Sequence, residues 1–336
     1  PSDEDWAYEY DGLNRLISST NGASASDNQT WQYDAIGRIQ ANSRAGAYGY
    51  PPATNSARPH APISIESGPL GALSFSYDNN GNMQTGNGRT NTFNARNQIV
   101  RVDVGSGTTA KSTEFTYGPD GTRIKKVLNG GTVALYPFGD DYEIDASGTV
   151  TKYFNAGFGV IAKKVGTTRY WLHTDRLGSV NAITDDTGAE VLRRSYRSYG
   201  TLLGEVRPSG GAHADSLGYI GQRTDQETKN SSAEDDGLTY LHARYYDPAL
   251  GIFLSPDPAG ADSNTYRYSG GDPVNFSDRS GLLKDPCDGD AACIEWYYRP
   301  TDPIMGMNMW DFQEAMGTYV GMLSLMGPRW TPKTGH

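Results

Sequence analysis

The chain has 336 residues, 36% of them hydrophobic, and a net charge of −10 at pH 7. Its length can bury a sizeable core, while the acidic balance argues against a nucleic-acid-binding surface. It has no uncharged apolar run long enough for a membrane-spanning helix, and its two cysteines do not fit a disulfide-stapled secreted domain. Abundant glycine (41 residues) and tyrosine (22) instead predict many short strands joined by tight turns.

One short motif recurs through residues 1–130. It runs aromatic, any residue, Tyr, Asp or a substitute, two residues, Gly or Asn, a polar residue and an aliphatic; the copies begin at Tyr8, Trp31, Phe75, Thr92 (degenerate) and Phe115. Each copy predicts a β-hairpin, because residue types alternate before the turn, Asp can bond its own downstream backbone, and Gly accepts positive φ. A hairpin cannot bury its packing face alone, so stacked copies should form one continuous sheet. The proline-rich stretch 51–69 interrupts the series and is interpreted as an inserted loop.

Residues 131–216 continue the hairpins. The run from Tyr142 to Val150 predicts strand, turn and strand, and the run from Tyr170 to Val180 predicts the next pair. We interpret His173 as a structural residue beside a turn, and likewise His242, which the pattern places on a strand.

Residues 217–282 are dense in tyrosine, glycine and Asp-Pro steps. They read LGYIGQRTDQET, then GLTYLHARYYDPALGIFLSPDP, then NTYRYSGGDPVNFSDRSGL. This segment resembles the RHS-repeat-associated core, and the upstream copies resemble YD repeats. The family comprises Rhs and YD-repeat proteins, including ABC-toxin C subunits, bacterial polymorphic toxins and, more distantly, teneurins. The resemblance implies an all-β fold in which YD-repeat hairpins form part of a large hollow β-spiral, with a short, partly helical C-terminal tail. An ordinary β-sandwich or propeller is the alternative.

In ABC-toxin members the core segment is a self-cleaving aspartyl protease. The resemblance implies that Arg244 is the essential arginine, in the Ala-Arg-Tyr-Tyr-Asp-Pro motif. It implies Asp257, in Ser-Pro-Asp-Pro, and Asp278, in Asp-Arg-Ser-Gly-Leu, as the two catalytic aspartates. The cleavage site would then be the bond between Leu282 and Leu283.

The residue types suit that chemistry. Two close carboxyl groups cannot both ionise cheaply, so one can hold a proton while the other takes one from water. An arginine can hold one carboxylate in place or stabilise an oxyanion. Structural alternatives remain: Asp257 could shape a loop, Arg244 could pack against Tyr245 or Tyr246, and Asp278 could cap a turn. Where the family usually has proline, this chain has Arg279, which we expect to loosen the turn.

Composition changes after Leu282, and the hairpin signals stop. Apolar residues at three- and four-residue steps predict one amphipathic helix over about 308–326. Cys287 and Cys293 could form a small disulfide loop or stay free. We expect no metal and no cofactor, because no ligand cluster accompanies these cysteines. The tail has the character of a variable toxin or cargo segment, whole or truncated.

We therefore divide the chain into a YD-repeat β-shell (1–130), continued shell (131–216), the RHS-repeat-associated core (217–282) and cargo (283–336). The leading hypothesis is the C-terminal part of a bacterial toxin shell, secreted or delivered at the cell surface, which cuts itself after Leu282. Its expected partners are its own cargo, the rest of the shell or a separate delivery subunit, and an immunity protein, without nucleic acid or a membrane span. The alternatives are a non-enzymatic surface or adhesion scaffold, and one half of a split shell that needs a partner chain.

Overall fold

The computed structural model describes residues 5–66, 68–156, 159–208, 215–260 and 262–282. The chain divides into a unit of Pro1–Gly289 and a unit of Asp290–His336, and every described residue belongs to the first. The described residues form strands and turns, and their only helices are three-residue 3-10 turns, which confirms the all-β prediction. None of the helices in these ranges is long and apolar enough to cross a membrane. The helix predicted over 308–326, Cys287 and Cys293 lie outside the described residues.

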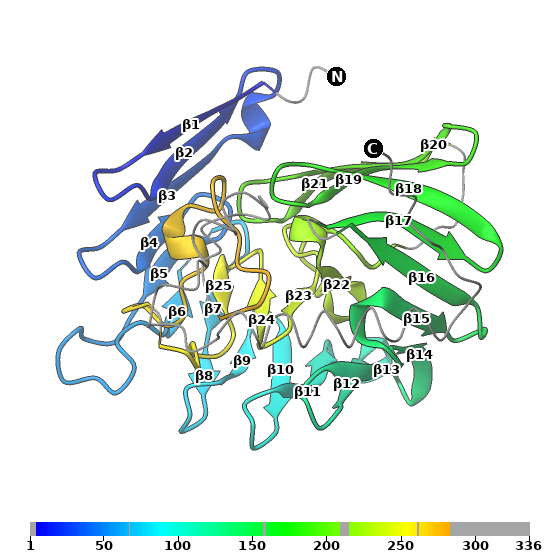
Figure 1. Ribbon diagram of the computed structural model, residues 1–336. Coiled ribbons are helices and arrows are strands. Elements are labelled where there is room, and N and C mark those ends of the chain that lie inside the picture. The colour runs from blue at the N-terminus through cyan, green and yellow to red at the C-terminus, as the bar shows by residue number, and fades with distance from the viewer. Residues whose placement is uncertain (1–4, 67, 157–158, 209–214, 261, 283–336) are drawn as a thin grey trace, which may run out of the picture. The chain divides into compact units, whose positions relative to one another are not determined.

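Two large antiparallel sheets, which we call the wall (residues 5–208), follow the chain hairpin by hairpin (Figure 1). The first contains β1 Trp6–Tyr10, β2 Leu16–Asn21, β3 Gln29–Tyr33, β4 Ile39–Asn42, β5 Gly46–Gly49, β6 Ser64–Ile65 and β7 Leu73–Ser74. The second contains β8 Ser76–Tyr77, β9 Met83–Gly86, β10 Arg89–Phe93, β11 Ile99–Val104, β12 Lys111–Tyr117, β13 Arg123–Leu128, β14 Gly131–Leu135, β15 Tyr142–Asp145, β16 Val150–Asn155, β17 Val160–Val165, β18 Thr168–Thr174, β19 Val180–Asp185, β20 Glu190–Tyr196 and β21 Leu202–Val206. Strand neighbours in space are neighbours in sequence throughout, and within the described ranges neither sheet closes on itself.

A third, four-stranded sheet belongs to what we call the closing segment (residues 215–282). It contains β22 Arg223–Asp225, β23 Leu238–Leu241, β24 Arg244–Asp247 and β25 Ile252–Phe253. The short 3-10 turns are η1 Ala25–Asp27, η2 Gly107–Thr109, η3 Gly139–Asp141, η4 Tyr219–Gly221, η5 Gln226–Thr228 and η6 Ser269–Gly271. One prediction is wrong here: His242 lies in the turn between β23 and β24 with a φ of 55°, and not on a strand.

The aspartate of each YD turn explains why the repeats fold as hairpins. In the first copy, Asp11 Oδ1 accepts hydrogen bonds from the backbone N–H groups of Leu13 (2.9 Å) and Arg15 (3.0 Å). Asp34 repeats the pattern with the N–H groups of Ile36 (3.1 Å) and Arg38 (3.0 Å). One aspartate side chain thus accepts two backbone N–H groups of the turn that form no hydrogen bond to a neighbouring strand. These bonds fix the conformation of the turn.

The arginine at the exit of a repeat then reaches the next repeat. Arg15 is ion-paired to its own Asp11 and donates from Nη1 to Asp34 O at 3.0 Å. Its guanidinium carbon also lies 4.7 Å from the ring centre of Tyr33, a cation–π distance. Successive hairpins are therefore tied together by side chains as well as by strand pairing.

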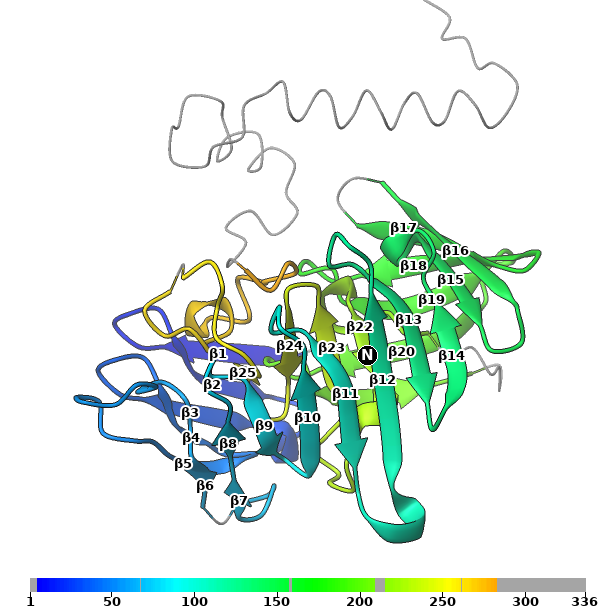
Figure 2. The same ribbon diagram turned by 90° about the horizontal axis from the view of Figure 1, so that it is seen from below.

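The hydrophobic core lies where the closing segment meets the wall. One buried cluster combines wall residues such as Ile65 and Val102 with Leu238 and Leu250 of the closing segment. A second joins Leu16 and Trp31 to the stacked rings of the closing segment, among them Tyr246 and Tyr268, whose centres are 4.3 Å apart. Figure 2 shows the same strands from below, with β22–β25 beside the wall strands. The closing segment thus supplies the apolar partner that a wall of single hairpins lacks.

Candidate active site

Arg244 opens β24 and is the hub of the predicted site. It is buried, and its Nη2 donates to Asp278 Oδ2 at 3.1 Å in an ion pair whose side chains are each 3% exposed. Its Nε donates to Gly281 O at 2.5 Å and its Nη1 to Thr265 O at 3.0 Å. The guanidinium carbon lies 3.5 Å from the ring centre of Phe253, within cation–π distance.

Asp278 lies at the end of the described chain, next to the predicted cleavage site. Its Oδ1 accepts the Leu282 N–H at 3.1 Å and the Ser280 hydroxyl at 3.3 Å. The carboxylate therefore binds the backbone of Leu282, the residue whose carbonyl the expected reaction would attack. Leu283, on the other side of that bond, lies outside the described residues.

Asp257 approaches the same arginine from another loop. Its backbone N–H donates to Thr265 O at 2.9 Å, the carbonyl that also accepts Arg244 Nη1. Burial lowers the pKa of Arg244, and the charges of Asp278 and then Asp257 oppose that shift, so both carboxylates act on this guanidinium. Asp257 also has its expected structural role, because its Oδ1 accepts the Ala259 N–H at 2.9 Å. The structure thus places the two predicted aspartates near Arg244, Asp278 through an ion pair and Asp257 through the shared carbonyl of Thr265.

Gly281 leaves room for this arrangement, because a Cβ there would overlap Leu241 O and stand 3.0 Å from Arg244 N. Its φ is also +68°, which L-residues adopt at a cost. We expect Gly281→Ala to lower the free energy of unfolding by about 2–4 kcal/mol, from strain and overlap together. Gly148→Ala is the matched control, since Gly148 has a φ of +84° and open space around it. Urea unfolding measures the loss of stability in each variant. Equal losses would contradict the prediction, because they would show that the structure adjusts around the added Cβ at no cost.

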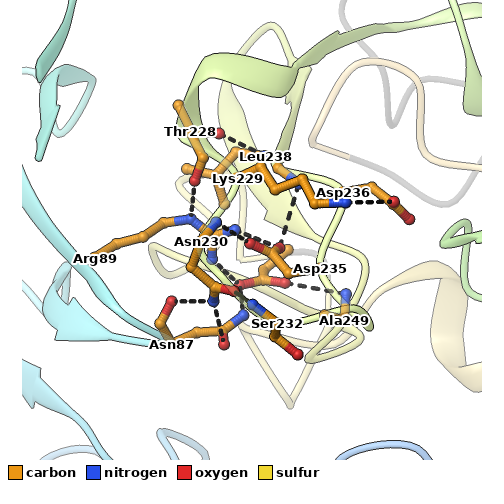
Figure 3. A network of polar contacts seen from close by, with 12 residues as sticks. Asn87, Arg89, Thr228, Lys229, Asn230, Ser232, Asp235, Asp236, Leu238 and Ala249 are labelled. Carbon is orange, nitrogen blue, oxygen red and sulfur yellow. Dashed lines mark hydrogen bonds and ion pairs between the residues drawn. The ribbon is translucent and has the colours of Figure 1, made fainter. Parts of the chain in front are cut away.

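A second polar centre, buried between the wall and the closing segment, was not predicted from the sequence. Figure 3 shows Arg89, from β10, reaching into the 228–238 loop. Its Nη1 donates to Asp247 Oδ2 at 2.8 Å, its Nη2 donates to Asp235, and its Nε donates to Thr228 O at 2.7 Å. All three ionic side chains are 1% exposed. Burial raises the pKa of Asp247, with Arg89 opposing the shift.

Other buried ion pairs join the same two parts of the chain. Asp225 accepts from Arg123 Nη1 at 2.5 Å and from Lys126 Nζ at 3.1 Å. Burial alone would raise the pKa of Asp225, but these two cations hold it below its ordinary value. Lys163 donates to Asp215 at 2.7 Å. Aspartates of the closing segment are thus neutralised by wall cations, which explains how so many charges are buried together.

Nothing in the described ranges forms a group of three or more His, Cys, Asp or Glu side chains suited to a metal ion.

Residues 2–274 match the family described as Teneurin YD-shell. The chain belongs to this family. The match covers the wall and nearly all of the closing segment, so the resemblance to YD-repeat shell proteins is confirmed, and this part of the chain is YD shell.

Curated relatives of the YD shell include large bacterial toxins. The tRNA nuclease WapA of Bacillus subtilis (strain 168) is 32% identical over 220 residues, covering 62% of this chain and 9% of the relative. Double-stranded DNA deaminase toxin A of Burkholderia cenocepacia (strain H111) is 25% identical over 317 residues, covering 82% of this chain and 20% of the relative. This chain thus corresponds in length to a small part of either protein.

Solved structures share the fold. A structure of the Photorhabdus luminescens Tc holotoxin pore matches with a TM-score of 0.57 at 18% identity, over 83% of this chain and 17% of the other. The crystal structure of TcdB2–TccC3 matches with a TM-score of 0.51 at 18% identity, over 82% of this chain and 17% of the other. At this identity the likeness shows a common YD-shell fold.

Proposed function

We propose that this chain is the C-terminal part of a bacterial toxin shell that cuts its own backbone after Leu282 and so separates the shell from the cargo segment 283–336. The observation that carries the proposal is the arrangement at Arg244, which binds Asp278 and Gly281 O while Asp257 acts on the same guanidinium.

The reaction is the hydrolysis of one peptide bond. Asp278, as the ion-paired partner of Arg244, is the charged member and takes a proton from a water whose oxygen attacks the Leu282 carbonyl carbon. Asp257 has the role of the acid, which gives a proton to the Leu283 nitrogen as the C–N bond breaks. The products are a carboxyl group on Leu282 and an amine on Leu283. Arg244 holds Gly281 O and so fixes the backbone one residue before the reacting carbonyl.

The proposal is tested by the mass of the purified chain. We expect two fragments, the larger ending at Leu282, because the site is assembled from residues of the described unit. Intact-mass spectrometry and N-terminal sequencing of the smaller fragment identify the bond. A chain that stays uncut over days would contradict the proposal and favour a non-enzymatic scaffold.

The relatives also guide the proposal about partners. WapA is named as a tRNA nuclease and the Burkholderia relative as a DNA deaminase toxin, and this chain spans 9% and 20% of them. We therefore infer that further shell comes from a longer parent chain or from a separate subunit. Secretion or delivery to the cell surface and an immunity protein follow from the same inference. Light scattering of the chain with candidate shell subunits checks whether it assembles.

A further inference from the structure

The wall turn Asp175–Ser179 and the closing stretch 274–279 hold each other through two arginines. Arg176, on the wall turn, donates from Nη2 to Val274 O and from Nη1 to Asn275 O at 3.3 Å. In the opposite direction, Arg279 donates from Nη2 to Leu177 O at 2.6 Å. We call this pair of crossed contacts the arginine clasp.

Gly178 provides the space for the clasp. A Cβ at this position would overlap Arg279 Nη2 and stand 3.0 Å from Arg279 Cζ. The turn is otherwise an ordinary YD turn, in which Gly178 N donates to Asp175 O at 3.0 Å and Ser179 N donates to Asp175 Oδ1 at 2.8 Å. Burial raises the pKa of Asp175. The positive charge of Arg279 lies nearby and opposes that rise.

The clasp lies directly beside the proposed catalytic residues. Arg279 follows Asp278 in sequence, so its side chain leaves the loop on the wall side while Asp278 binds Arg244. Two residues later, Gly281 O is held by Arg244. The loop that carries the proposed bond is therefore fixed at both ends of the three-residue stretch 279–281, by the wall at Arg279 and by β24 at Gly281.

We propose that Arg279, together with Arg176 and Gly178, is a positioning device for self-cleavage, and this inference rests on the proposed function. Both arginines of the clasp bind main-chain oxygens, so the clasp fixes the backbone of the two segments. The proton transfers themselves are made by Asp257 and Asp278. Its effect is to keep Leu282 within reach of the Asp278 carboxylate, because a displacement of about 1 Å can slow a positioned reaction by about a hundredfold.

Matched glycines provide the decisive comparison. Gly188 ends the turn that begins at Asp185, donates to Asp185 O at 3.0 Å, has a φ of +82°, and has open space where a Cβ would lie. Gly178 has a φ of +85° but faces Arg279. Alanine at either site therefore brings the same backbone strain, and only Gly178→Ala displaces the clasp.

The first measurement is the rate of fragment formation by the full chain. We expect Gly178→Ala, Arg279→Ala and Arg176→Ala each to slow cleavage about ten- to a hundredfold, while Gly188→Ala slows it less than about twofold. Combining Gly178→Ala with Arg279→Ala should add little beyond Arg279→Ala, since both remove the same contact. Equal slowing by Gly178→Ala and Gly188→Ala would overturn the proposal.

A second measurement does not depend on cleavage. In a chain blocked by Asp257→Asn, hydrogen exchange of the Leu282 amide, which donates to Asp278, reports the position of the loop. We expect Arg279→Ala to speed this exchange about tenfold without a change at β10. If the unsubstituted chain is never cut, the proposed function fails, and the exchange still tests the clasp. Unchanged exchange, or faster exchange with an unchanged cleavage rate, overturns the clasp as a positioning device.

Discussion

Replacing Asp257 or Asp278 by asparagine is expected to leave the chain uncut, with a loss of cleavage rate of at least about a hundredfold. The proposed reaction needs one carboxyl to take a proton and the other to give one, and an amide can do neither. Asparagine has nearly the same shape, and its oxygen can still accept the Leu282 N–H that Asp278 accepts at 3.1 Å. The fold should therefore survive. Denaturing gels over a time course measure the rate, and circular dichroism checks the strand content.

Asp262→Asn is the matched control for these variants. Asp262 is a third carboxylate whose charge acts on Arg244, but it forms its own ion pair with Arg267 at 2.8 Å, with a quarter of its side chain exposed. We expect this variant to be cut at nearly the normal rate. If all three substitutions slow cleavage alike, the effect comes from the charge balance around Arg244, and the assignment of Asp257 and Asp278 is wrong.

Replacing Arg89 by methionine is expected to lower the free energy of unfolding by about 3–5 kcal/mol, because two buried carboxylates lose their cation together. Asp235 and Asp247 are each 1% exposed, so water cannot replace the guanidinium without opening the interface. Methionine keeps most of the buried volume, which separates the loss of charge from the loss of packing. Urea unfolding followed by tryptophan fluorescence measures the change.

Arg169→Met is the control for this prediction. Arg169 pairs with Asp186 at 3.2 Å, but the two side chains are 63% and 44% exposed, and exposed pairs contribute little. We expect no resolvable change in the unfolding midpoint. A similarly small effect at Arg89 would mean that the interface between the wall and the closing segment takes up water on losing the cation.

The hairpins could be predicted from sequence because their chemistry is local. The turns at Asp11 and Asp34 are each specified within five residues, by an aspartate that accepts the N–H groups two and four residues downstream. The predicted site was found by a different route, since motif resemblance selected Arg244, Asp257 and Asp278 without showing that they meet. The structure adds that Asp278 is ion-paired to Arg244, and that the backbone N–H of Asp257 donates to the Thr265 carbonyl, which also accepts from Arg244.

The long-range polar contacts could not be predicted. Arg279 and Leu177 are 102 positions apart, and Arg89 and Asp247 are 158 apart. No period or spacing in the sequence links such pairs. They are brought together only when all the intervening wall strands have folded. For the same reason, the motif identifies Arg279 only as a replacement for proline, whereas in the structure its side chain binds the wall turn at Leu177 O.

The buried aspartates of the closing segment have a consequence for the order of events during synthesis. Read forward along the chain, Asp215, Asp225 and Asp247 contact progressively earlier wall strands, β17 through Lys163, then β13 through Arg123, then β10 through Arg89. These closing-segment residues therefore fold back along hairpins made earlier in synthesis, by seconds to tens of seconds at a translation rate of about 5–20 residues per second. Arg244 and Asp278 both lie in the closing segment, so under the proposed function a nascent chain that stalls before this segment would lack the groups that cut it.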